Sequence, residues 1–233
     1  MQTTDTTSDS PADGTLLTAR GVRTREALLA ASRRLFETEG YANTTIADIT
    51  READKALGSF YTYFDNKEAV LQQLAEDFKS EVESRVTDLD LVNAEPYDVL
   101  REVCAVYWYS CRDHAGELAA IFQASMLDER FAVAWRSIRA DARRNLADGI
   151  RSASDAGLAS DPNPEATASA LGSMMDYFCY VWLVEGGEAD QGSIPDGVAI
   201  DTMARILFRT IFASAEPTAA TPLPMPTADG GIT

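Results

Sequence analysis

Hydrophobic residues recur every three or four positions along most of the chain, which is the spacing of one face of an α-helix. The first stripe consists of Leu28, Ala31, Leu35 and Phe36 and predicts a helix over residues 24–39, which Gly40 ends. The same reasoning predicts further helices over residues 46–53, 57–64, 66–86, 96–114, 117–126, 129–156, 165–185 and 196–215. No segment reads convincingly as a strand. We therefore predict an all-α fold of about nine helices.

Two of the predicted helices are short and follow each other closely within residues 44–67. Thr45 and Asp48 form a start signal close to a capping box at the beginning of the first. In the second, Phe60 and Phe64 lie four positions apart on one side, and the opposite side is small and polar. Two short helices joined by a tight turn predict a helix-turn-helix, whose second helix enters the major groove of DNA.

An ordered series of residues runs through this region: Ala30-Ala31, Leu35-Phe36, Gly40-Tyr41, Thr44-Thr45, Ile46, Ile49, Ala53, Gly58, Phe60-Tyr61-Thr62-Tyr63-Phe64 and Lys67-Glu68. With it, residues 25–74 resemble the DNA-binding domain of the TetR family of bacterial transcriptional regulators. The resemblance covers the first third of the chain, and the remainder matches the family in layout alone.

The resemblance implies roles for individual residues of the motif. It places Leu57, Gly58, Ser59 and Thr62 at base-facing positions and Thr45, Tyr61, Tyr63 and Lys67 at phosphate-facing positions, with Phe60 and Phe64 in the core. Lys55, a cation of the same segment, completes the predicted DNA-binding set. The implied function is a repressor that binds double-stranded operator DNA as a homodimer and is released by a small hydrophobic effector.

The turn of the motif departs from the family pattern, because Asp54-Lys55-Ala56 stands where relatives usually have Gly-Val-Ser. Glycine suits a turn with positive φ, which Asp tolerates better than most residues. Ala56 cannot cap the second helix, a loss that typically costs about 1 kcal/mol. The flanking helices should keep the domain folded. The rival hypothesis is an all-helical ligand-binding or adaptor protein whose DNA-binding activity has been lost.

The net charge of −17 lies mostly outside the predicted DNA-binding segment. Residues 20–67 contain eight basic and seven acidic residues, whereas the residues after them carry a net charge of −15. DNA binding requires only a local patch of phosphate-facing Arg and Lys. Arg20, Arg23 and Arg25 precede or open the first helix and are either a DNA-contacting arm or a solvated basic start. The charge is compatible with DNA binding but does not by itself indicate it.

Length and composition suit one or two globular domains, with 233 residues of which 45% are hydrophobic and 24% charged. No apolar run reaches the length of a transmembrane helix, and residues 1–14 lack the features of a secretory signal. We expect a cytoplasmic protein without a membrane partner. The predicted organisation is a disordered leader (1–19), a DNA-binding domain (20–74), a ligand-binding and dimerisation domain (75–215) and a disordered tail (216–233).

The last two predicted helices carry more apolar side chains than one monomer could bury at its edge. These are Leu171, Met174, Met175, Phe178, Val181 and Trp182 in one helix and Met203, Ile206, Leu207 and Phe212 in the other. Ala168, Gly172 and Ser173 allow close approach between helices. We predict a homodimer built on a four-helix bundle, which would place two recognition helices about 34–36 Å apart. Packing within the monomer is the alternative.

An aromatic cluster predicts a ligand pocket in the second domain. Tyr107, Trp108 and Tyr109 are consecutive, so at least one must face a cavity or an interface instead of the main core. The predicted lining consists of Tyr107, Trp108, Cys111, Phe122, Trp135, Arg139, Tyr177 and Phe178. Plain core packing is the commoner reason for any one aromatic residue at such spacing.

Three arginines lie on one face of the predicted helix over residues 129–156. Arg136, Arg139 and Arg143 have no acid four positions later, so something anionic should face them. Acids on a neighbouring helix are the commoner answer in so acidic a protein. The alternative is the anionic head of a ligand, such as the phosphates of an acyl-CoA.

Catalytic and metal-binding patterns are missing from the sequence. Cys104, Cys111 and Cys179 form no CxxC pair and are expected to be reduced core residues. His114 is the single histidine and has no cluster of partners, so we predict neither a metal site nor His-dependent catalysis. The chain is predicted not to be an enzyme and to use no cofactor other than an effector.

Overall fold

The computed structural model describes residues 18–90, 94–158 and 163–212. Within these ranges the regular structure is helical, which confirms the predicted all-α fold. The helices are α1 (Ala19–Thr38), α2 (Ile46–Glu52), α3 (Leu57–Phe60), α4 (Lys67–Thr87), α5 (Pro96–Asp113), α6 (Ala115–Leu127), α7 (Glu129–Ile138), α8 (Ala140–Asp155), α9 (Pro164–Leu183) and α10 (Asp196–Ile211). None of these helices combines the length and apolar character needed to cross a membrane.

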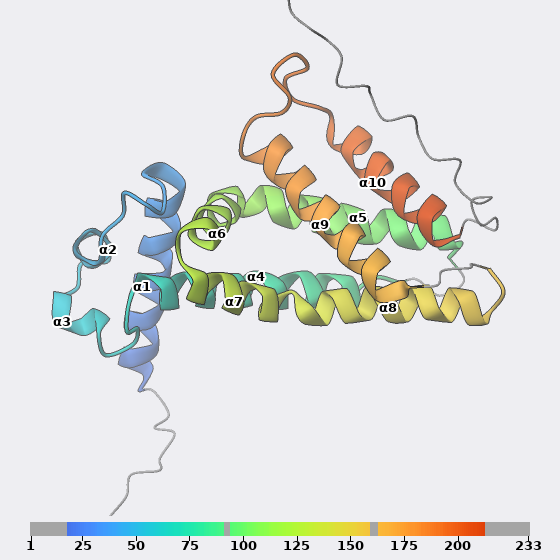
Figure 1. Ribbon diagram of the computed structural model, residues 1–233. Coiled ribbons are helices and arrows are strands. Elements are labelled where there is room, and N and C mark those ends of the chain that lie inside the picture. Colours follow the sequence, from blue (N-terminus) through green and yellow to red (C-terminus); the bar gives the residue numbers. More distant parts are fainter. Residues whose placement is uncertain (1–17, 91–93, 159–162, 213–233) are drawn as a thin grey trace, which may run out of the picture.

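The helices form a small amino-terminal unit and a larger body (Figure 1). Helices α1, α2 and α3 lie at one end, and α1 packs against α2, α4 and α6. In the body, α5 lies beside α10 and α8 lies beside α9. Helix α4 leaves the amino-terminal unit and runs into the body, where it contacts α5 and α7.

Two hydrophobic cores hold these helices together. The first contains buried residues of α1 to α4 together with Ala120, Ile121 and Ala124 of α6 and Phe131 and Ile138 of α7. The second joins α4, α5, α8, α9 and α10 around the fully buried Trp108 and Met203. The predicted domain boundary at residues 74–75 falls inside α4, and body helices complete the first core.

Helix ends agree with the local signals, with three adjustments. Pro96 opens α5 and Pro164 opens α9, where Asn163 accepts a hydrogen bond from the backbone N–H of Ala166 at 3.1 Å. Helix α1 begins at Ala19 instead of residue 24, because Thr18 caps it. Helix α3 is shorter than predicted. The long helix predicted over residues 129–156 is divided at Arg139 into α7 and α8.

The division at Arg139 follows from the two cores. Ile138 at the end of α7 is buried in the first core, whereas Ala147 and Ile150 of α8 are buried in the second. The predicted tail and the leader up to residue 17 lie outside the described residues.

Candidate nucleic-acid interface

The first helix of the predicted motif, α2, starts with the expected reciprocal cap. The Thr45 hydroxyl accepts a hydrogen bond from the backbone N–H of Asp48 at 3.2 Å, and Asp48 Oδ2 accepts one from the N–H of Thr45 at 3.0 Å. The Thr45 hydroxyl also donates to Asp48 Oδ2 at 2.5 Å. Hydrogen bonds from Thr45 and then Arg51 lower the pKa of Asp48. A DNA phosphate would have to compete with this cap for the Thr45 hydroxyl.

The unusual turn keeps the geometry of a helix-turn-helix. Asp54 has φ of 53°, and among the described residues it is the one non-glycine residue in the left-handed region. The backbone N–H of Lys55 donates to the carbonyl of Thr50 at 2.9 Å and closes the turn. Ala56 occupies the N-cap of α3 without a side-chain hydrogen bond, as its sequence predicts.

Helix α3 spans only Leu57–Phe60, because residues 61–63 continue as a turn. Phe60 and Phe64 are buried, which confirms their predicted place in the core. On the outer side Leu57 is 51% exposed and Tyr61 is 55% exposed. A Cβ added at Gly58 would meet no atom within 4 Å. The outer side of α3 is therefore accessible to a partner.

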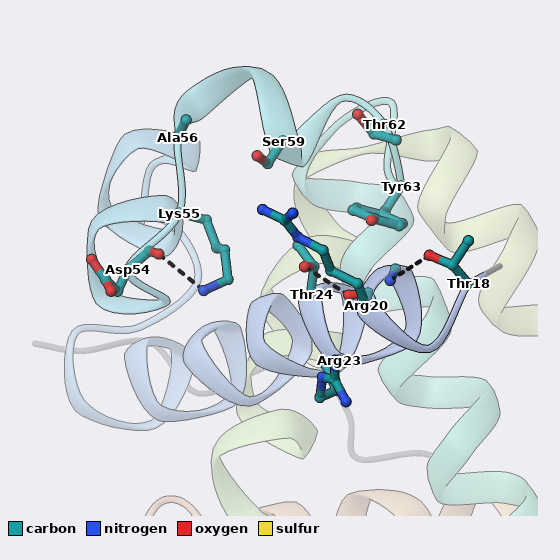
Figure 2. A pocket seen from close by; sticks show the side chains of 11 residues that line it. Thr18, Arg20, Arg23, Thr24, Asp54, Lys55, Ala56, Ser59, Thr62 and Tyr63 are labelled. Carbon is teal, nitrogen blue, oxygen red and sulfur yellow. Dashed lines mark hydrogen bonds between the residues drawn. The ribbon is translucent and has the colours of Figure 1, made fainter.

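A groove of about 730 Å³ separates the start of α1 from the turn and α3 (Figure 2). It is lined by Thr18, Arg20, Gly21, Arg23, Thr24, Asp54, Lys55, Ala56, Ser59, Thr62 and Tyr63. Figure 2 shows Arg20 reaching from α1 toward Ser59, with Lys55 across the groove, while Arg23 points away from α3. The lining holds three cations and one acid, so the groove is suited to an anionic partner.

The groove unites four predicted DNA-binding residues (Lys55, Ser59, Thr62 and Tyr63) with residues of α1. Sequence reasoning left the role of Arg20 and Arg23 open and missed Thr18 and Thr24. The signal for Thr18 was available, because Thr before a helical stretch is a typical N-cap, and its hydroxyl accepts from the N–H of Gly21 at 3.2 Å. Arg20 and Arg23 are part of a helix, not of an extended arm.

Lys67 is positioned differently from a free phosphate-binding lysine. Its ammonium donates to the carbonyls of Tyr41 at 2.6 Å and Thr44 at 2.8 Å, and it lies 4.1 Å from the centroid of the Tyr41 ring. Partial burial lowers the pKa of Lys67. Lys67 therefore fixes the loop between α1 and α2, and sequence reasoning did not predict this structural contact.

The predicted ligand-binding residues are divided between different surroundings in the body. Trp108 and Cys111 are buried in the second core, and the Trp108 indole donates to Asp196 Oδ1 at 2.9 Å. Phe178 packs beside Trp108, whereas Trp135 packs against the first core. Tyr107 and Phe122 also pack against the second core, so five of the eight predicted residues share it and Trp135 lies apart from them.

Tyr107 and Arg139 do meet, through a residue that was not predicted. The Tyr107 hydroxyl donates to Asp176 Oδ1 at 2.5 Å, and Arg139 lies 2.5 Å from Asp176 Oδ2. The Arg139 contact lacks hydrogen-bond geometry, so among the described residues Oδ2 has no donor. Burial raises the pKa of Asp176 although Arg139 and Tyr107 oppose this effect. An acid inside the otherwise apolar α9 was the sequence signal for this contact.

Arg139 therefore has the neighbouring-helix acid that the sequence favoured. Arg136 and Arg143 are exposed. Phe122 and Tyr177, the remaining predicted ligand-binding residues, form a surface aromatic cluster with Tyr180, in which the Phe122 and Tyr180 rings are 4.4 Å apart.

Several residues predicted for a dimer interface are instead core residues of the monomer. Leu171, Val181, Met203 and Leu207 are buried in the single chain. Of the three small residues, Ala168 is buried, Gly172 faces Arg139, and Ser173 is exposed. For these four residues the alternative of packing within the monomer holds.

The cysteines and metal sites can be assessed within the described part of the chain. Cys104, Cys111 and Cys179 are free and buried, and burial raises the pKa of Cys104 to about 12. These ranges contain no group of three His, Cys, Asp or Glu side chains that could hold a metal ion.

Comparison with known proteins assigns the amino-terminal unit to a family. Residues 28–74 match "Bacterial regulatory proteins, tetR family". The uncharacterized HTH-type transcriptional regulator YerO of Bacillus subtilis is 28% identical over 107 residues, which are 45% of this chain and 37% of that protein. The matches to this and two further curated relatives span between 37% and 52% of those proteins' lengths.

Solved structures share the fold over most of the chain. A TetR-family regulator from Syntrophomonas wolfei superposes with a TM-score of 0.69 at 20% identity, covering 81% of this chain and 94% of that one. The fatty acid degradation regulator FadR of Bacillus halodurans superposes with a TM-score of 0.63 at 14% identity, covering 79% and 94%. At these identities the likeness concerns the fold alone.

Proposed function

Because this chain belongs to the TetR family of bacterial transcriptional regulators, we propose that it is a repressor that binds operator DNA as a homodimer and is released by a small hydrophobic effector. The observation that carries the proposal is the cationic groove between α1 and α3. It concentrates Arg20, Arg23 and Lys55 in a protein with a net charge of −17. The intact turn at Asp54 favours DNA binding over the adaptor alternative.

DNA binding is tested with duplexes selected by the protein from a randomised pool. Arg20→Ala and Lys55→Ala should each weaken binding to all sequences and lower the salt slope of log K by about one, because each removes one phosphate contact. Arg209→Ala is the matched control, since Arg209 is exposed on α10 in the body. Slopes that change equally in all three variants, or in none, would refute the groove as the DNA site.

The proposed dimer uses the outer face of α9. Exposed Ala166, Ala170, Ser173 and Tyr177 lie three or four positions apart, so they form one stripe of mostly small side chains. Pairing of this stripe with its copy, beside α10, would make a four-helix bundle with a self-complementary interface.

Sedimentation tests the dimer. Ser173→Glu would bury a charge at the centre of the interface and should give helical monomers at micromolar concentration. Ser152→Glu on the exposed face of α8 is the control and should stay dimeric. A dimeric Ser173→Glu protein would exclude this face.

The proposed effector is an acyl chain with an anionic head, for which an acyl-CoA is the candidate. Its head group would take the place of Asp176 at Arg139, and its tail would enter among the aromatic residues of α5 and α9. One solved structure with the same fold is named as a regulator of fatty acid degradation. Each buried methylene should contribute about 0.8 kcal/mol.

Calorimetry tests the acyl tail and the anionic head group of the proposed effector separately. The ligands are acyl-CoAs, free acids and neutral esters of equal chain length. Affinity should rise with chain length in every series, and Arg139→Gln should remove the preference for anionic heads. An unchanged head preference in Arg139→Gln would refute the role of Arg139.

A further inference from the structure

A buried ionic cluster joins the amino-terminal unit to the body. Arg33 of α1 donates through Nε to Glu117 Oε1 at the start of α6. The same oxygen lies 3.0 Å from Nδ1 of His114, between α5 and α6. The other ring nitrogen, Nε2, lies 3.0 Å from Glu81 Oε2 on α4. Glu117 is 2% exposed, so residues of α1, α4 and α6 meet around one buried carboxylate.

Acidic groups outnumber arginines around His114. Glu81 and Glu117 face the ring directly, and Arg33 binds the same oxygen of Glu117 that the ring contacts. Arg85 of α4 lies 2.6 Å from Glu81 and 3.6 Å from Asp113 at the end of α5. The three acids exceed the two arginines by one charge, which an imidazolium supplies. The ring of Phe78 lies edge-on against the imidazole, with centroids 5.6 Å apart.

The hydrogen-bond geometry leads to the same conclusion. A neutral imidazole has one N–H and one lone pair, so one of the two carboxylates would face a lone pair. An imidazolium donates to both. The hydrogen bond to Glu117 raises the pKa of His114, although burial opposes this effect.

The helices at this junction are packed too closely to absorb a local change. A Cβ at Gly116 would lie 2.6 Å from Cβ and 2.7 Å from Cα of Glu37, so α6 and α1 touch at backbone level. Glu117 Oε2 has no hydrogen-bond donor among the described residues. Loss of the proton leaves the ring one N–H, and if Glu117 keeps that N–H, Glu81 faces a lone pair. Movement of α4 away from His114 would relieve this repulsion and loosen the junction of α1, α4 and α6.

We propose that His114 is a proton-operated lock that holds α1, α4 and α6 in the DNA-binding arrangement while it is charged and releases them when it loses its proton. The choice of the DNA-binding arrangement rests on the proposed function, in which the effector-free protein binds DNA. A histidine with a raised pKa contributes stability that is present below about pH 6.5 and is lost as the pH rises through its pKa in the folded protein. DNA affinity should therefore fall as the pH rises through that value.

The charge of His114 can be measured without any variant, because the chain contains a single histidine. Its imidazole gives one titrating resonance in the NMR spectrum of the full-length protein. We expect the pKa to be above the usual 6.5 in the free protein and higher when DNA is bound. A value at or below 6.5 in the free protein would overturn the proposal.

The lock itself is tested by the pH dependence of DNA affinity and of thermal stability, compared between the wild type and His114→Gln. The probe is duplex DNA selected by the wild-type protein from a randomised pool. The wild type should lose affinity with rising pH, by at most about tenfold for each pH unit that separates the pKa of the free and DNA-bound protein. His114→Gln keeps a side-chain amide but cannot titrate, so it reports the pH dependence that comes from all other groups.

Glu81→Gln gives an independent check, since it removes one of the two acids that face the ring. It should move the NMR titration of His114 and the fall in DNA affinity to lower pH together. Identical pH profiles of affinity and thermal stability in the wild type and His114→Gln would overturn the lock. If the protein bound no duplex at any pH, the proposed function would fail, and the thermal-stability profiles and NMR titration would still decide whether the lock exists.

Discussion

The crossing of α1 and α6 at Gly116 allows a sharp test of the packing between the amino-terminal unit and the body. Gly116→Ala places a methyl group 2.7 Å from Cα of Glu37, and a backbone atom cannot rotate out of the way. Overpacking of this kind lowers the free energy of unfolding by about 1–3 kcal/mol. Replacement of Gly by Ala within a helix raises it by up to about 1 kcal/mol. We expect a net loss of about 1–2 kcal/mol in the free energy of unfolding.

Gly149→Ala is the matched control, because the substitution is identical and the surroundings are open. Gly149 lies inside α8, and an added Cβ would meet nothing within 4 Å. The control should gain about 1 kcal/mol in the free energy of unfolding. Urea denaturation followed by circular dichroism measures both, with equal m-values required for the comparison. If Gly116→Ala were stabilised as much as Gly149→Ala, the close approach of α1 and α6 would be wrong.

Three further substitutions test other parts of the structure. Ala56→Ser supplies the missing N-cap of α3 and should raise the free energy of unfolding by about 1 kcal/mol in urea denaturation; no gain would mean that α3 does not start there. Lys67→Met removes the donor that binds two loop carbonyls, of which that of Tyr41 keeps the N–H of Thr44, and should cost about 1–3 kcal/mol of stability by the same assay; full stability would make Lys67 a free phosphate ligand. Asp176→Asn removes the acid beside Arg139 and should tighten calorimetric binding of acyl-CoAs but not of neutral esters; equal effects on both would contradict the effector proposal.

Features encoded by neighbouring residues could be predicted from the sequence. The cap at Thr45 and Asp48 depends on residues three positions apart, and the burial of Phe60 and Phe64 depends on helical spacing. The missing cap at Ala56 was predictable for the same reason. Local chemistry determines these features, and the surrounding fold does not alter them.

Features that depend on distant contacts could not be predicted in the same way. Lys67 suits a phosphate contact by its place at a helix start, but the carbonyls that it binds belong to a loop more than twenty residues earlier. The apolar residues of α9 predicted an interface, yet Leu171 packs in the second core and Val181 is buried within the same chain. Periodicity identifies which side chains will be buried and does not identify what buries them.

Helix α4 connects the DNA-binding unit with the body. Val70, Leu71 and Leu74 belong to the first core, and Phe78 belongs to the second. Its 21 residues make a helix about 30 Å long, so a displacement of its second half by an effector would reach its first turn. There Lys67 holds the carbonyls of Tyr41 and Thr44, which belong to the loop before α2. An effector that binds more tightly to one of two placements of α4 would favour that placement and thereby reorient α2 and α3. The effector would not need to contact the DNA-binding unit.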